Sequence, residues 1–257
     1  MRVTVLGCGA STGVPVIGGN WGRCDPNDPR NRRRRVSVLV EMGATVILID
    51  TSPDLREQLL DARVTWINAV VMTHAHADHL HGIDDLRSVN RLMRSAIPLY
   101  ADAGTLAEIA NRFGYVFKPI DERGRFYKPT LVPHEIVGPF EIDGISVLPF
   151  VQDHGYSATL GLRIGGFAYS TDVTELDDNA FGALEDVDLW IVDCLRRDPH
   201  PTHSHLAKTL SWITRARPGH AVLTHMDQSL DYCELSAELP SGVEPGYDGL
   251  VIELPDP

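Results

Sequence analysis

The chain has 257 residues, 43% of them hydrophobic, and a formal net charge of −12. This length and composition suit a substantial core, so we expect residues 1–257 to form a single domain. The acidic balance disfavours a nucleic-acid surface, which depends on cationic side chains, and no run of about 18 apolar residues would span a membrane.

The N-terminal region pairs a short strand with a long loop. A strand-like run over residues 1–7 starts without the apolar segment of a signal peptide, and the four cysteines form no Cys-x-x-Cys pair, so we expect a cytoplasmic protein. Residues 7–35 are rich in Gly, Pro, Asn and Asp and are predicted to be a loop. Five arginines lie within Arg30–Arg35. They form either a solvated loop or a basic rim that attracts an anionic substrate.

Two strands and a helix are predicted next. Residues 36–41 and 45–49 have a β-type pattern and are joined by a hairpin turn. Thr51 or Ser52 is predicted to cap the following helix, with Pro53 in its first turn.

The stretch Thr73–Gly82 carries most of the candidate chemistry and follows a short apolar run. It contains three imidazoles and a carboxylate within six residues: His74, His76, Asp78 and His79. Imidazole and carboxylate together suit zinc, manganese or iron. In an extended loop His74 and His76 point the same way and can hold one ion, while Asp78 and His79 reach a second. A two-metal site is the direct inference.

The rest of the chain alternates between helical and strand-like segments. Helices are predicted near 84–93, 103–113, 176–184 and 206–216, and strand-like runs near 97–100, 142–148, 159–164, 167–170, 189–192 and 221–223, with short β segments between 114 and 151. His154, Asp172 and His225 each lie just beyond such a run, as His74 does, so one edge of a sheet system can collect them. We expect an α/β fold, an αββα sandwich of two mixed β-sheets flanked by helices.

The motif His-x-His-x-Asp-His resembles the signature of the metallo-β-lactamase superfamily of hydrolases. The resemblance implies two divalent metal ions, Zn²⁺ or Mn²⁺. It assigns the first ion to His74, His76 and His154 and the second to Asp78, His79 and His225, with Asp172 bridging the two. It also implies that Asp50 orients the histidine motif.

Within the superfamily, the chain is most similar to the PhnP-type phosphodiesterases. The similar segments are Gly13-Val14-Pro15, the arginine run, Asp193-Cys194, Val222–His225 and a tail from Leu239 to Gly249. That family carries a cysteine cluster and a histidine for a structural zinc, whereas this chain offers only Cys24 in the first loop and has Gln228 in place of the histidine. We therefore predict no structural zinc, and the shape of the first loop stays open.

The resemblance also suggests a proton donor. By this resemblance, His203 corresponds to the histidine that looks like the general acid in phosphodiesterases of this fold. We therefore expect His203 to bind substrate and to be catalytic, together with Asp78 and Asp172. His205 is its competitor and a candidate phosphate contact. Ser204 is predicted to cap the helix that starts at residue 206. Asp193 is expected to be structural, and four further histidines are expected in solvated loops: His81, His134, His200 and His220.

The leading hypothesis is a binuclear phosphodiesterase that hydrolyses a small cyclic or nucleotide-like phosphodiester through a hydroxide that bridges the metals. A tRNA 3′-processing endonuclease is the first rival, although no long basic insertion is visible. A lactonase or thioesterase of the same fold is the second, and a nucleotide sensor without catalysis is the third. The expected partner is a small phosphodiester or nucleotide-like substrate, neither a membrane nor a nucleic acid is expected, and a homodimer stays open.

Overall fold

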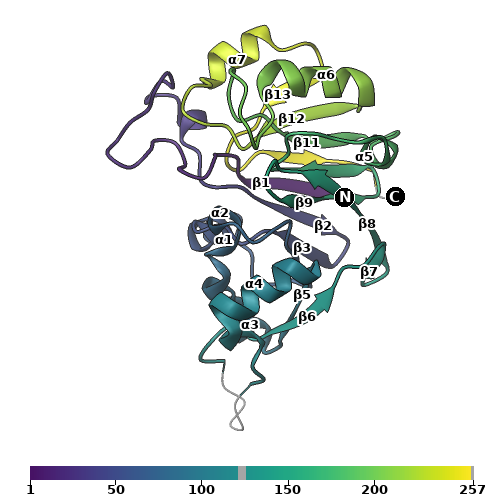
Figure 1. Ribbon diagram of the computed structural model, residues 1–257. Coiled ribbons are helices and arrows are strands. Elements are labelled where there is room, and N and C mark those ends of the chain that lie inside the picture. Colours follow the sequence, from purple (N-terminus) through teal and green to yellow (C-terminus); the bar gives the residue numbers. More distant parts are fainter. Residues whose placement is uncertain (121–125, 256–257) are drawn as a thin grey trace.

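Two seven-stranded β-sheets pack face to face in this computed structural model, which describes residues 1–120 and 126–255 (Figure 1). The first sheet has the order β14 (Val251–Glu253), β1 (Arg2–Gly7), β2 (Ser37–Met42), β3 (Thr45–Ile49), β4 (Ala69–Val71), β5 (Ile97–Ala101) and β6 (Leu131–Glu135). The second has the order β13 (Val243–Pro245), β12 (His220–Thr224), β11 (Leu189–Asp193), β10 (Phe167–Ser170), β9 (Ala158–Ile164), β8 (Ile145–Asp153) and β7 (Phe140–Ile142).

Both sheets are mixed, with the same division of strand directions. In the first sheet β14, β1, β2 and β3 are antiparallel, and β3 to β6 run parallel. In the second sheet β7 to β10 are antiparallel, and β10 to β13 run parallel. Chain segments that follow parallel strands leave at the same sheet edge, which is where open α/β sheets place their ligand sites.

Helices cover the outer face of each sheet (Figure 1). The α-helices are α1 (Leu55–Asp61), α2 (Ala77–Leu80), α3 (Leu86–Met93), α4 (Ala103–Phe113), α5 (Asp178–Ala183), α6 (Leu206–Ala216) and α7 (Tyr232–Glu238). Short 3₁₀ helices span Pro29–Asn31, Ile83–Asp85 and Gly114–Phe117. Helices α1, α3 and α4 pack on the first sheet, and α5, α6 and α7 on the second. The predicted αββα sandwich is confirmed.

The alternation of side chains along β3 shows why this architecture forms. Ile47 and Ile49 belong to the apolar cluster between the sheets, whereas Leu48 between them belongs to the cluster beneath α1 and α3. Successive side chains of a strand point to opposite faces, so a strand covered on both sides is apolar throughout. None of the helices within residues 1–120 and 126–255 is long and apolar enough to cross a membrane.

Two predictions about local structure were wrong. The first helix starts at Leu55 rather than at Pro53, and neither predicted residue caps it: Ser52 Oγ accepts a hydrogen bond from Asp54 N, and the Thr51 hydroxyl donates to Leu80 O. The alternating run 142–148 is not one strand.

A two-residue turn at Asp143 and Gly144 divides that run. Both residues have positive φ, 49° and 81°, and they join β7 to β8. Asp-Gly is a favoured pair for such a tight hairpin. The predicted short β segments between 114 and 151 are otherwise present as β6, β7 and β8, and residues 121–125 lie outside the described part of the chain.

Candidate metal centre

The histidine motif begins where β4 ends and turns into the short helix α2. His76 is extended, with φ −67° and ψ 156°, and precedes the first helical residue, Ala77. The His74 and His76 rings lie 4.5 Å apart, while Asp78 and His79 are buried within α2. The rings of His74 and His79 lie 4.2 Å apart, so the two pairs of side chains adjoin each other.

Three other strand ends bring the remaining candidate ligands to the motif. His154 follows β8, Asp172 follows β10 and His225 follows β12, and all three are at most 3% exposed. Asp172 and His225 have positive φ values of 53° and 57°. Such backbone is uncommon for residues other than glycine and costs about 1–3 kcal/mol, a strain that is concentrated at functional sites.

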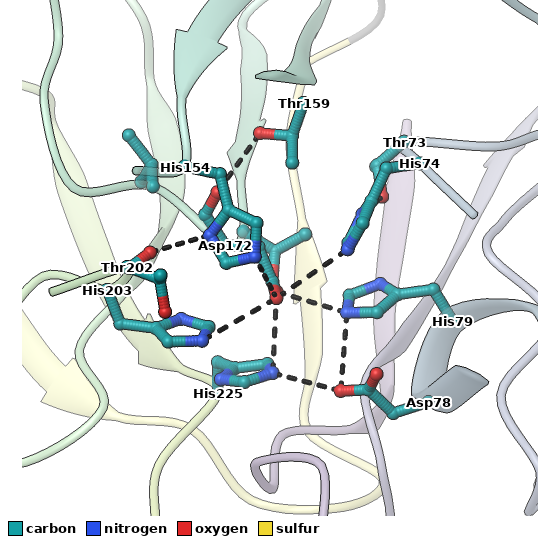
Figure 2. A network of polar contacts seen from close by, with 12 residues as sticks. Thr73, His74, Asp78, His79, His154, Thr159, Asp172, Thr202, His203 and His225 are labelled. Carbon is teal, nitrogen blue, oxygen red and sulfur yellow. Dashed lines mark hydrogen bonds and ion pairs between the residues drawn. The ribbon is translucent and has the colours of Figure 1, made fainter. Parts of the chain in front are cut away.

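The ligand atoms fall into two groups that share the Asp172 carboxylate. In each group these atoms lie within 4.8 Å of one another: His74, His76, His154 and Asp172 in one, and Asp78, His79, Asp172 and His225 in the other. Asp172 Oδ2 lies 3.7 Å from His74 Nε2 and 3.6 Å from His154 Nε2. Asp172 Oδ1 lies 3.0 Å from His79 Nε2 and 3.3 Å from His225 Nε2 (Figure 2). One carboxylate oxygen thus serves each group.

These residues fit a pair of divalent ions. His74 Nε2 is buried and, among the described residues, has no hydrogen-bond partner, a state that is costly unless a further group such as an ion supplies the missing interaction. Burial, reinforced by His79, holds the pKa of His74 well below its usual value, which keeps the ring in the neutral form that binds metal. Burial alone raises the pKa of Asp172, but His225 and His79 outweigh it and keep this carboxyl ionised.

Buried partners fix the orientation of the candidate ligands. Asp50 Oδ2 lies 2.7 Å from His79 Nδ1, and Asp50 Oδ1 accepts from Thr73 N at 2.8 Å. His154 Nδ1 lies 2.6 Å from Thr202 O, so it is the donor and leaves Nε2 facing the cluster. Asp50 thus makes the contacts expected of a residue that orients the histidine motif.

His203 lies at the edge of the same cluster. Its Nδ1 is 3.1 Å from Asp193 Oδ2, and its Nε2 is 3.8 Å from Asp172 Oδ2. The ring stacks on His225 with centroids 4.6 Å apart and is 11% exposed. Asp193 is fully buried and also accepts from Val173 N, so it holds the ring from behind, as a structural residue would.

Comparison with known proteins places the chain in a family. A model of the "Beta-lactamase superfamily domain" matches residues 45–226. A crystal structure described as "a New Diphosphatase from the PhnP Family" is 35% identical, covers 99% of this chain and 98% of its own, and superposes with a TM-score of 0.91. The chain belongs to the PhnP family of this superfamily. Membership of a hydrolase family supports hydrolase activity for this chain.

Other relatives carry different names. An octanoyltransferase from Porphyromonas gingivalis is 34% identical over 97% of this chain, but the chain spans only about half of that protein (51%). Coenzyme PQQ synthesis protein B from Acinetobacter baumannii is 23% identical, covering 99% of this chain and all of its own. The short form of human tRNase Z, at 18% identity and a TM-score of 0.73 over both whole chains, shares the fold.

The structure separates the two histidines that compete for the proton-donor role in this PhnP-family chain. His205 is the residue before α6, and within the described residues no hydrogen bond, ion pair or ring contact joins its ring to the metal-ligand cluster. Its role as a phosphate contact stays a prediction. Ser204 does not cap α6, because its Oγ is buried against Thr209 Oγ1 at 2.7 Å.

Two of the four histidines assigned to solvated loops belong to strands, and a third, His200, is a half-buried residue of a loop at the site. The His200 ring is 5.2 Å from the His203 ring at the site, a contact that depends on the path of the 195–205 loop. His134 and His220 belong to strands β6 and β12, and His220 pairs with Glu244. Only His81 is exposed outside a regular element, against Phe113.

The arginine run of this PhnP-family chain is solvated only in part, because Arg30 and Arg32 are exposed and the other three arginines are buried or half-buried. Its role as a basic rim for an anionic substrate stays a prediction. Three of its guanidinium groups pair with carboxylates: Arg30 with Asp28, Arg34 with Asp248 and Asp61, and Arg35 with Asp54. Arg32 lies over the ring of Trp21. Arg33 is 2% exposed and donates to the carbonyls of Asp227 and Leu230. The run therefore ties the first loop to the C-terminal region.

Cys24 is buried beside Arg33, where its Sγ lies 3.4 Å from Leu230 O and 3.5 Å from Gln228 O. The absence of a structural zinc stays a prediction.

Proposed function

We propose that this PhnP-family chain is a binuclear, metal-dependent phosphodiesterase that hydrolyses a small cyclic or nucleotide-like phosphodiester. The observation that carries the proposal is the placement of His203. Asp193 holds its Nδ1, so its Nε2 faces the shared carboxylate Asp172 at 3.8 Å. A donor at the edge of a metal-ligand cluster suits a reaction whose leaving oxygen needs a proton.

The candidate centre also has the charge that a phosphodiester requires. Asp78 and Asp172 bring two negative charges, and two divalent ions would leave an excess of about two positive charges that attracts an anionic diester. Such ions would lower the pKa of a bound water toward about 7 and polarise the phosphoryl oxygens. The carboxylate of Asp78 lies 3.3 Å from His225 Nε2, which keeps it within the second ligand group.

His203 supplies what the ions do not. In an in-line displacement the leaving oxygen departs opposite the attacking oxygen and gains negative charge. A proton on His203 Nε2 neutralises that charge, and the buried Asp193 carboxylate stabilises the charged ring that donates it. This role matters for an alkoxide leaving group and matters little for p-nitrophenolate, which leaves without a proton.

The test uses protein reconstituted with Mn²⁺ or Zn²⁺ and two diesters, bis(p-nitrophenyl) phosphate and a 2′,3′-cyclic nucleotide. We expect Asp172→Ala to abolish hydrolysis of both, and His203→Ala to lower kcat on the cyclic nucleotide by about 10²-fold or more with a much smaller loss on the reporter. His205→Ala is the matched control and should leave the ratio of kcat on the cyclic nucleotide to kcat on the reporter unchanged. Turnover of a thioester or a lactone, with both diesters untouched, would overturn the proposal in favour of carbonyl chemistry.

A second candidate is hydrolysis of a small diphosphate. It rests on the description of the 35% identical PhnP-family structure as a diphosphatase. The same ligand set would suit it, because both reactions displace an oxygen from phosphorus. Parallel assays on the cyclic nucleotide and on a nucleoside diphosphate ester, compared by kcat/KM, decide between the two.

A further inference from the structure

A cleft of about 510 Å³ opens beside one half of the metal centre. Its walls come from the histidine motif, where His74 and His76 line it, from the first three turns of α4, and from Ser157 and Ala158 at the β8–β9 turn. The volume is typical of small-molecule sites. His203 does not line the cleft, and Figure 2 shows it on the opposite side of the Asp172 carboxylate from His74.

Away from the candidate ligands His74 and His76, the side chains of the cleft have little positive charge to offer a ligand. The guanidinium group of Arg112 donates to Ala75 O, and its Nε lies 3.5 Å from Glu108 Oε2. Asp102 adds a second carboxylate, which accepts from Thr105 N and Thr105 Oγ1. The remaining wall is made of small side chains: Ala75, Ala77, Gly104 and Ala158. This lining suits an uncharged organic group with hydroxyls or a flat ring and disfavours a second phosphate.

In-line displacement decides which part of a diester the cleft can hold. The attacking and leaving oxygens lie on one line through phosphorus, and the ester oxygen that stays on phosphorus points to the side of that line. Under the proposed function the leaving oxygen lies beside His203, which is absent from the cleft wall, so in an acyclic diester, whose two ester groups are separate, the cleft is left for the group that stays on phosphorus. We propose that the cleft binds the uncharged alcohol group that remains esterified to phosphate in the product. This inference rests on the proposed phosphodiesterase function and deepens it: the cleft selects the phosphomonoester that the enzyme releases.

Two reporter substrates separate the retained group from the leaving group. Bis(p-nitrophenyl) phosphate and methyl p-nitrophenyl phosphate lose the same p-nitrophenolate, but they retain an aromatic ring and a methyl group respectively. Ala158 is exposed on the cleft wall, at the start of β9, and is not itself a candidate ligand, so Ala158→Trp would narrow the cleft while keeping every ligand side chain. We expect this variant to lose about tenfold or more in kcat/KM on the bis ester, chiefly through KM, and to stay within about twofold on the methyl ester.

The matched control is Ala44→Trp, which adds an exposed tryptophan at the turn between β2 and β3. It should leave kcat/KM on both esters unchanged. Metal content and thermal unfolding should be equal in the unaltered protein and the two variants. Equal losses on the two esters would overturn the inference, because the cleft would then hold the leaving group or the substitution would have damaged the centre. No loss on either ester would overturn it as well. Failure of the unaltered protein to cleave either diester would instead refute the proposed function.

Discussion

Three residues beside the candidate metal centre adopt a backbone conformation that glycine usually provides. Asp50, Asp172 and His225 have φ values of 61°, 53° and 57°, and each lies within two residues of the end of a strand. The left-handed conformation turns the chain sharply at the end of the strand, so that the side chain of the turning residue points into the site. Strained backbone conformations of this kind are concentrated at functional sites, where the position of the side chain matters more than the cost of the strain.

Asp193 is predicted to be a positioning residue that acts through His203. Asp193→Asn keeps an acceptor of similar shape for Val173 N but removes the charge that stabilises the protonated His203 ring. We expect kcat on a cyclic nucleotide to fall by about 10²-fold, whereas kcat on bis(p-nitrophenyl) phosphate changes little. The split between the two substrates is the measurement. Equal losses on both would show a purely structural role.

The position of each residue just beyond a strand predicted which side chains would meet, because strand ends of the two packed sheets converge at one edge of the sandwich. His74, His154, Asp172 and His225 lie together for that reason. The environment of His200 and the contact of Ser204 with Thr209 depend on how the 195–205 loop folds over the site. No periodic pattern records such a path, so these contacts could not be predicted.

At the scale of elements, the first loop is held by a buried cation. Arg33 donates to Leu230 O at 2.7 Å and to Asp227 O at 3.1 Å, across almost two hundred residues of sequence. Arg33→Met would leave the buried Leu230 carbonyl and the half-buried Asp227 carbonyl without these donors. We expect a loss of about 2–4 kcal/mol in the free energy of unfolding, measured by urea denaturation.

Arg32→Met is the control for that substitution. Arg32 is exposed and lies over Trp21, so its replacement should change stability by less than about 0.5 kcal/mol. If the two variants were equally stable, the Arg33 guanidinium would not be what holds the loop.

The strands could be predicted more securely than the points where elements begin. Strand β3 is apolar on both faces, and this pattern predicts a buried strand whatever the adjoining turns do. The start of α1 was missed because Ser52 bonds to Asp54 N and Thr51 to Leu80 O, and the second contact is made across the fold. A capping residue can be recognised from sequence only when no distant partner competes for its hydroxyl.

At the scale of the whole molecule, the candidate metal centre joins the two sheets. The histidine motif belongs to the first sheet, and His154, Asp172 and His225 belong to the second. Ions held between them bind the folded chain only, so they should stabilise it. We expect removal of metal with a chelator to lower the Tm by at least about 5 °C, measured by calorimetry and reversed by Mn²⁺ or Zn²⁺.

The variant Asp172→Ala tests whether that stabilisation comes from this centre. It lacks the carboxylate that both ligand groups share, so added metal should raise its Tm much less than that of the unaltered chain. An unchanged Tm of the unaltered chain after chelation would contradict the prediction.

The pairing of β14 with β1 also has a consequence for how the protein is made. Val3 lies opposite Ile252, so β1 can pair with β14 only after residues 251–253 have been synthesised. Strands β1 to β6 appear before any strand of the second sheet, and their inner face, with Val38, Ile47 and Ile49, has nothing to pack against at that stage. Until β8 to β12 have emerged, the nascent chain therefore exposes an apolar surface of the kind that chaperones bind.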